Sequence, residues 1–88
     1  MPKLHEEAGY IFEMVMYDCA ERKHAHVKGN GKGGAKFWLE PTVEIASPGR
    51  YNEREISQII AIIQANRSKM IRKWTEECDK VQAERKIR

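Results

Sequence analysis

His24 and His26 stand two residues apart in a segment, His24–Lys28, in which polar and apolar residues alternate. This alternation predicts a half-buried strand, and side chains at positions i and i+2 of a strand share one face. Imidazole changes its charge close to neutral pH, so two histidines on one face are suited to acid–base catalysis. The first candidate site is therefore the sheet face that carries this pair.

The segment Ala35–Glu40 alternates in the same way and predicts a partner strand. If Val27 points to the core, the polar residues of both strands point to the opposite, open face. We expect that face to carry His24, His26, Lys28, Lys36, Trp38 and Glu40. Glu13 and Tyr17, from an earlier predicted strand, are further candidates for the same face.

This mixture of groups could carry out acid–base chemistry, and the lysines that flank the hairpin could contact a phosphate backbone. We assign His24 and His26 as the candidate acid–base pair, and Lys36 as the cation that would stabilise charge on a phosphorane, with Lys28 as an alternative. The candidate nucleic-acid or partner contacts are Lys28, Lys32, Trp38, Glu40, Arg67, Arg72 and Lys73. The plainer interpretation, a solvated polar surface without an activity, stays open.

A metal site is a weaker interpretation of the His-x-His pair. A third ligand would have to come from His5, Cys19 or Glu13, and none of these has a diagnostic spacing. The stretch Gly29–Gly34 resembles a phosphate loop superficially, but a strand rather than a helix follows it. We therefore expect no metal and no cofactor, and a hairpin at the glycines.

The elements that would position these residues form a sheet over residues 9–46, after a polar lead-in over residues 1–8. Asn30-Gly31 is a strong signal for a tight hairpin, because both residues tolerate positive φ. Pro41 should interrupt the ladder, and Ser47–Gly49 should end the sheet. The predicted strands are Tyr10–Tyr17, His24–Lys28, Ala35–Glu40 and Thr42–Ala46, which gives a three- to four-stranded antiparallel sheet.

Helical periodicity follows over residues 52–82. Asn52 and Glu55 have the spacing of a capping box. An apolar stripe at helical spacing comprises Ile56, Ile59, Ile60 and Ile63, and a second segment carries Met70, Ile71, Trp74, Cys78 and Val81. We expect two C-terminal helices with a break near Ala65, where Asn66 suits an N-cap. One bent helix is the alternative, and residues 83–88 should form a frayed basic tail.

The helices should pack on one face of the sheet, which makes an α+β fold with two layers around one core. The sheet should contribute Phe12, Met14, Met16, Ala25, Val27, Phe37, Leu39, Val43 and Ile45. The helical part should contribute the isoleucine stripe and Trp74, with Cys78 as a small buried hydrophobe.

The length of 88 residues predicts one domain, which would bury only about 60–65% of its unfolded surface, so a homo-oligomer or a partner would help it. Residues 1–44 carry a net charge of −1 and residues 45–88 a net charge of +4. Such a mild basic excess permits binding to RNA or DNA without requiring it. Cys19 and Cys78 are too few for a secreted disulfide scaffold, so we expect reduced thiols in a cytoplasmic protein without a membrane span.

Two sets of residues, taken together, resemble a known family. His24–Val27, a glycine-rich turn and Ala35–Pro41 form the first set, and Asn52–Ile56 with Asn66–Trp74 form the second. Over residues 8 to 80 the chain resembles the bacterial domain-of-unknown-function 4160 family. It departs from the pattern before His24, where members often have two prolines and this chain has Arg22-Lys23.

The resemblance implies a small protein that is often encoded beside a member of the domain-of-unknown-function 2442 family, in an arrangement similar to a type II toxin–antitoxin pair. The matching motif positions are His24, His26, Lys36, Trp38, Glu40 and Trp74, and no catalytic assignment comes with them. We therefore expect a toxin-like component that binds or acts on nucleic acid, such as a metal-independent ribonuclease, with a small antitoxin-like partner. A non-enzymatic interaction or DNA-binding module is the alternative.

Overall fold

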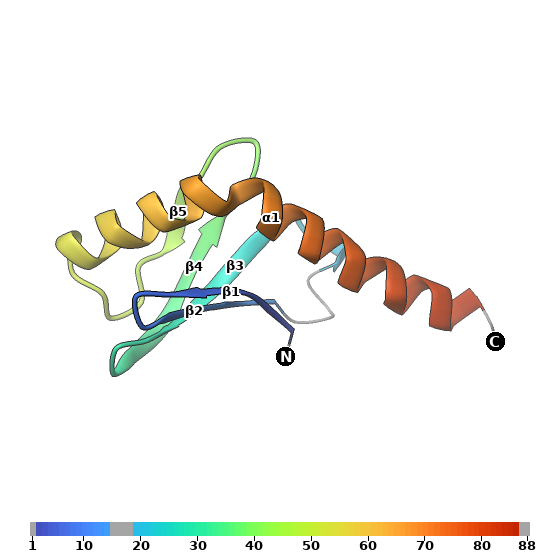
Figure 1. The fold of residues 1–88 in the computed structure, drawn as a ribbon, viewed down its shortest axis with the longest axis horizontal. Helices are drawn as coiled ribbons and strands as arrows, with labels where there is room; N and C mark the ends of the chain where they lie inside the picture. Colours follow the sequence, from blue (N-terminus) through green and yellow to red (C-terminus); the bar gives the residue numbers. More distant parts are fainter. Residues whose placement is uncertain (1, 15–18, 87–88) are drawn as a thin grey trace.

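Five antiparallel strands in sequential order and one long helix make up the computed structural model, which describes residues 2–14 and 19–86, with side chains to residue 80 (Figure 1). The strands are β1 (Lys3–Glu7), β2 (Tyr10–Glu13), β3 (His24–Gly29), β4 (Lys32–Trp38) and β5 (Glu44–Ser47). The helix, α1, spans Glu53–Lys86. The α+β class is confirmed, but the sheet has one strand more than the three or four that the sequence predicted.

The additional strand is β1, which replaces the predicted polar lead-in. It pairs with β2 through a two-residue turn at Ala8 and Gly9, both of which have positive φ. Its one buried apolar side chain is Leu4. A strand with so few apolar residues has no clear alternation, which is why the sequence did not reveal it.

The predicted Asn30-Gly31 turn is present between β3 and β4. Gly29 pairs with Lys32, and φ is 53° at Asn30 and 77° at Gly31. Positive φ at both turn residues is the type I′ arrangement that matches the twist of a hairpin. The first predicted strand is observed as β2 as far as Glu13, and the expectations for Val15 to Tyr17 lie outside the described residues.

The predicted break near Ala65 is wrong and the alternative, one helix, is confirmed, because α1 is a single helix that continues to Lys86 through most of the predicted tail. Figure 1 shows that its axis changes direction part-way along. The Asn66 side chain donates from Nδ2 to the Ile62 carbonyl at 2.8 Å, the acceptor that the Asn66 backbone N–H would take in a regular helix. Asn66 therefore acts inside the helix, where such competition accompanies bends, and does not cap a second helix.

The core lies between α1 and one face of the sheet. Its strand side chains are Leu4, Tyr10, Phe12, Met14, Ala25, Val27, Ala35, Phe37 and Leu39. Its other members are Tyr51, Ile56, Ile59, Ile62, Ile63, Met70, Trp74 and Cys78. Ile45 was expected in this core but is 45% exposed, because it lies on the edge strand β5. Val43 is partly buried against the core.

Candidate functional site

A row of polar side chains crosses the sheet face opposite the core. Glu13 of β2 pairs with His26 of β3, His26 pairs with Lys36 of β4, and Lys36 pairs with Ser47 of β5. Directly opposed residues in antiparallel strands hold their Cβ atoms about 4.5–5.5 Å apart. The register therefore places a carboxylate, an imidazole, an ammonium and a hydroxyl side by side. We call this row and the neighbouring Trp38 the open-face site.

Trp38 is the aromatic element of the open-face site. The Arg22 guanidinium carbon lies 4.6 Å from the centre of its ring, and Lys36 Nζ lies 4.7 Å from it. Both distances are within the range of cation–π attraction. A half-buried indole with two cations over its ring brings an aromatic side chain and positive charge together in one place.

Ion pairs balance several of the cations on this face. Lys28 Nζ lies 2.9 Å from Glu13 Oε1, and Lys36 Nζ lies 3.5 Å from Glu21 Oε1. Glu13 is a buried carboxylate, whereas Glu21 is half exposed and its contact with Lys36 is the longer of the two, so the Lys36–Glu21 pair is of the weak surface kind. An anionic ligand could therefore exchange with Glu21 at Lys36 at little cost.

His24 does not lie exposed on the open face, which corrects the sequence-based expectation. Its side chain is fully buried, and its Nδ1 lies 2.8 Å from the Arg22 carbonyl oxygen. Because a carbonyl can only accept, Nδ1 carries the proton in this hydrogen bond. The ring packs edge-on against His26 at 4.9 Å and Trp38 at 5.6 Å between centres. His24 therefore lies beside His26 and Trp38 at a covered end of the open face, and its ring is not accessible to a ligand.

The second half of α1 and the connection before β3 explain the burial of His24. The Trp74 ring lies 6.5 Å from the His24 ring, with Lys23 Nζ 5.5 Å from the Trp74 ring centre. Cys19 and Cys78 form a disulfide that links the same two segments. The expectation of reduced thiols is thus wrong, because the fold brings the two cysteines together across 59 residues.

Three of the predicted contact residues make internal bonds. Lys32 Nζ lies 2.6 Å from Glu55 Oε1, and Lys23 Nζ lies 3.1 Å from Glu40 Oε1. Arg67 donates from Nε to the Leu39 carbonyl at 2.6 Å and from Nη2 to the Pro41 carbonyl at 3.2 Å. These side chains hold the hairpin, the helix and the β4–β5 connection together, so we do not assign Lys32, Glu40 or Arg67 to the open-face site.

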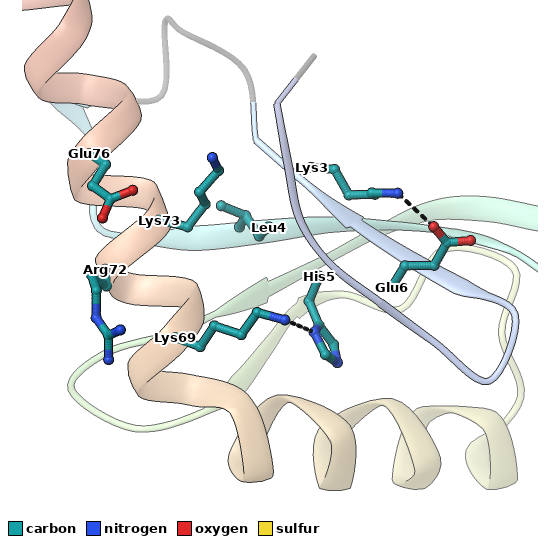
Figure 2. Close-up of a pocket in the computed structure, with 8 residues that line it drawn as sticks. All are labelled: Lys3, Leu4, His5, Glu6, Lys69, Arg72, Lys73 and Glu76. Carbon is teal, nitrogen blue, oxygen red and sulfur yellow. Dashed lines mark hydrogen bonds and ion pairs between the residues drawn. The ribbon is translucent and has the colours of Figure 1, made fainter.

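The last two predicted contacts, Arg72 and Lys73, do not belong to the open-face site with His26. They line a cavity of about 380 Å³ between α1 and β1, which we call the β1–α1 groove (Figure 2). Its lining residues are Lys3, Leu4, His5, Glu6, Lys69, Arg72, Lys73 and Glu76. The structure thus divides the predicted residues among the open-face site, internal contacts and this groove.

Sequence reasoning missed Arg22, Glu21 and Lys69, and it considered His5 only as a possible metal ligand. Glu21 and Arg22 lie outside the predicted strands, and nothing in their spacing indicates that they contact Lys36 and Trp38 of β4. Lys69 meets His5 across 64 residues, a contact that only the tertiary fold creates. In the part of the chain that the structure describes, no three His, Cys, Asp or Glu side chains converge as metal ligands would.

Comparison with known proteins gives one match. Residues 9–75 match the family described as a domain of unknown function, DUF4160. The search of curated proteins found no match, and neither did the search of solved structures. The matched region includes β2, β3, β4, β5 and much of α1, and therefore every residue of the open-face site. No helix among the described residues is long and apolar enough to cross a membrane.

Proposed function

Because this chain belongs to the DUF4160 family, we propose that it is the toxin-like component of a bacterial toxin–antitoxin module and binds single-stranded RNA on its open face. The observation that carries the RNA-binding proposal is Trp38, held against Arg22 and Lys36 beside His26. The toxin-like role and a small antitoxin-like partner follow from the gene arrangement that the family resemblance implies.

The open face suits a single strand better than a duplex. Single-stranded RNA exposes its bases, which stack on aromatic side chains, while cations contact the backbone. Trp38 would stack with a base, and Lys36, Arg22 and Lys28 would contact phosphates. In a duplex the base faces are already stacked on one another, so they could not stack on the Trp38 indole.

If the bound RNA is cleaved, His26 is the residue placed to act. It would take the proton of a ribose 2′-hydroxyl as that oxygen attacks the neighbouring phosphorus. Lys36, directly opposite on β4, would stabilise the phosphorane charge and protonate the departing 5′-oxygen. The products would be a 2′,3′-cyclic phosphate and a 5′-hydroxyl. His24, buried beside it, would position His26 and would not transfer protons.

Binding of a fluorescently labelled RNA of about ten nucleotides, a length typical for one small domain, tests the proposal. Trp38→Ala should weaken binding about tenfold, because it removes one stacked base. Lys80→Gln, which removes an exposed lysine of α1, is the matched control and should bind like the original protein. Equal affinity of Trp38→Ala and the control would exclude the open face as the binding site.

Induction in bacteria without the partner tests the toxin-like role separately. We expect growth arrest that co-expression of the neighbouring small protein relieves. Arrest that persists in His26→Ala but is lost in Trp38→Ala would indicate toxicity by binding alone. Unchanged growth on induction of the original protein would refute the toxin-like role.

A further inference from the structure

The β1–α1 groove combines an apolar floor with a charged rim. Leu4 is 3% exposed at its base, and the His5 side chain is 10% exposed. Cations from α1 line one wall, and Figure 2 shows Lys69 extending from α1 across the groove to His5. None of these residues takes part in the open-face site.

Lys69 is held in place by a chain of hydrogen bonds. Its Nζ lies 2.8 Å from His5 Nδ1, and His5 Nε2 lies 2.9 Å from Glu7 Oε1. An ammonium can only donate, so Nδ1 accepts and Nε2–H donates to the carboxylate. These hydrogen bonds hold the Lys69 ammonium and the His5 ring in fixed positions in the groove when no ligand is bound.

β1 is an edge strand of the described sheet, with β2 as its one neighbour. An edge strand presents backbone N–H and C=O groups that can pair with an added strand. Lys3 Nζ pairs with Glu6 at 2.7 Å, a contact that holds the pKa of the Glu6 carboxyl below its usual range. Glu6 therefore stays ionised, and like Glu76 it adds negative charge to the rim.

The spacing of the helix cations matches that of an extended peptide. Lys69 and Lys73 lie one turn apart on α1, which corresponds to about 6 Å along the helix axis. Side chains on the same face of a strand are two residues apart, which corresponds to about 6.4–6.8 Å along the strand. Carboxylates at positions i and i+2 of a strand lying on β1 would therefore face Lys69 and Lys73, with Arg72 beside them. The carboxylate opposite Lys73 would share that cation with Glu77, whose Oε1 lies 3.2 Å from Lys73 Nζ.

These features favour an acidic peptide over a nucleic acid. A polyphosphate would bring continuous negative charge against Glu6 and Glu76, and it could not pair with the strand backbone. A peptide can place carboxylates opposite the cations and neutral residues opposite the glutamates. We propose that the β1–α1 groove binds an acidic, extended segment of a partner protein, which adds to the sheet as a strand beside β1.

A synthetic peptide in which glutamate and valine alternate tests this proposal. Binding to the ¹⁵N-labelled full chain is followed by amide hydrogen exchange and by fluorescence anisotropy. We expect slower exchange of β1 amides in the complex. Lys69→Gln combined with Lys73→Gln should weaken binding about tenfold, since two exposed ion pairs are lost.

Arg54→Gln, at an exposed cation of α1 that does not line the groove, is the control on the same helix and should change the affinity less than twofold. Thermal unfolding shows whether each variant is folded. Trp38→Ala should also leave peptide binding unchanged, which separates this proposal from RNA binding on the open face. A peptide with a central proline keeps the carboxylates but removes a backbone donor, so it should bind about tenfold more weakly.

Three outcomes would overturn the proposal. Equal affinity of the proline peptide would exclude strand addition. Equal affinity of the Lys69/Lys73 double variant would exclude the groove. Protection of β1 amides by a single-stranded RNA, with no protection by the peptide, would assign the groove to nucleic acid.

Discussion

Lys32 Nζ lies 2.6 Å from Glu55 Oε1, and this ion pair joins the β3–β4 hairpin to the first turn of α1. The same carboxylate accepts from the Asn52 backbone N–H at 3.0 Å. Nearby, the Tyr51 hydroxyl lies 3.0 Å from the Gly29 carbonyl and 3.3 Å from the Lys32 carbonyl. The hairpin that carries the open-face site is thus fixed to the start of the helix by two neighbouring contacts.

Glu55 should make stability depend on acid pH. The hydrogen bond from Lys32, followed by that from the Asn52 backbone, holds the pKa of the Glu55 carboxyl below its ordinary value of about 4.3. Its stabilising contribution is therefore complete above that value and is lost as pH falls through the lowered pKa. Urea unfolding should find Glu55→Gln less stable than the original protein at pH 7, with the gap closing in acid. Glu53→Gln, also in the first turn, is the control, and a gap that did not depend on pH would contradict the assignment.

Asn52 should contribute to stability as the N-cap of α1. Glu55 N–H donates to Asn52 Oδ1 at 2.9 Å, which completes the reciprocal capping box. Asn52→Ala should lower the free energy of unfolding by about 1 kcal/mol, whereas Asn52→Ser, which keeps a side-chain acceptor, should lower it much less. Denaturant titration of the two variants measures the difference, and equal losses would show that the cap bond is not the cause.

The disulfide should be a large contributor to stability. It closes a loop across 59 residues, for which the chain-entropy relation gives about 4 kcal/mol. A reducing agent should therefore lower the unfolding temperature of the original protein and leave a Cys19→Ala/Cys78→Ala variant unaffected. An unchanged unfolding temperature after complete reduction, checked by thiol titration, would contradict this expectation.

Two isoleucines should differ strongly in their effect on stability. Ile59 of α1 is fully buried in the core, whereas Ile45 is 45% exposed on β5. Ile59→Ala should cost about 2–5 kcal/mol because it leaves a cavity. Ile45→Ala should cost less than about 1 kcal/mol. Comparable losses in chemical denaturation would mean that β5 is covered in solution, for example by a second copy.

The sequence was sufficient to predict those elements whose signal lies in neighbouring residues. The Asn30-Gly31 turn and the Asn52–Glu55 box depend on residues within one turn of each other, and both were predicted correctly. The continuity of α1 was not, because Asn66 suits a cap as well as it suits a helix interior. The next residue, Arg67, donates to the Leu39 and Pro41 carbonyls, and these hydrogen bonds favour a helix that continues through this position. Their acceptors are 26 to 28 positions away in the sequence, so no local pattern reveals them.

In the candidate site, too, local pattern predicted some features and tertiary contacts decided others. Alternation alone placed His26, Lys36 and Trp38 on one face. It could not reveal that the end of this face is covered by Trp74 and the disulfide-linked connection, which buries His24.

Periodicity in the sequence thus determined the α+β class, the central hairpin and the polar composition of the open face, because these follow from backbone geometry and nearest neighbours. Tertiary structure decided which of those polar side chains remain accessible, which cysteines meet, and that β1 lies beside Lys69 to form a groove. These outcomes depend on contacts between segments some 60 residues apart, which no local pattern encodes.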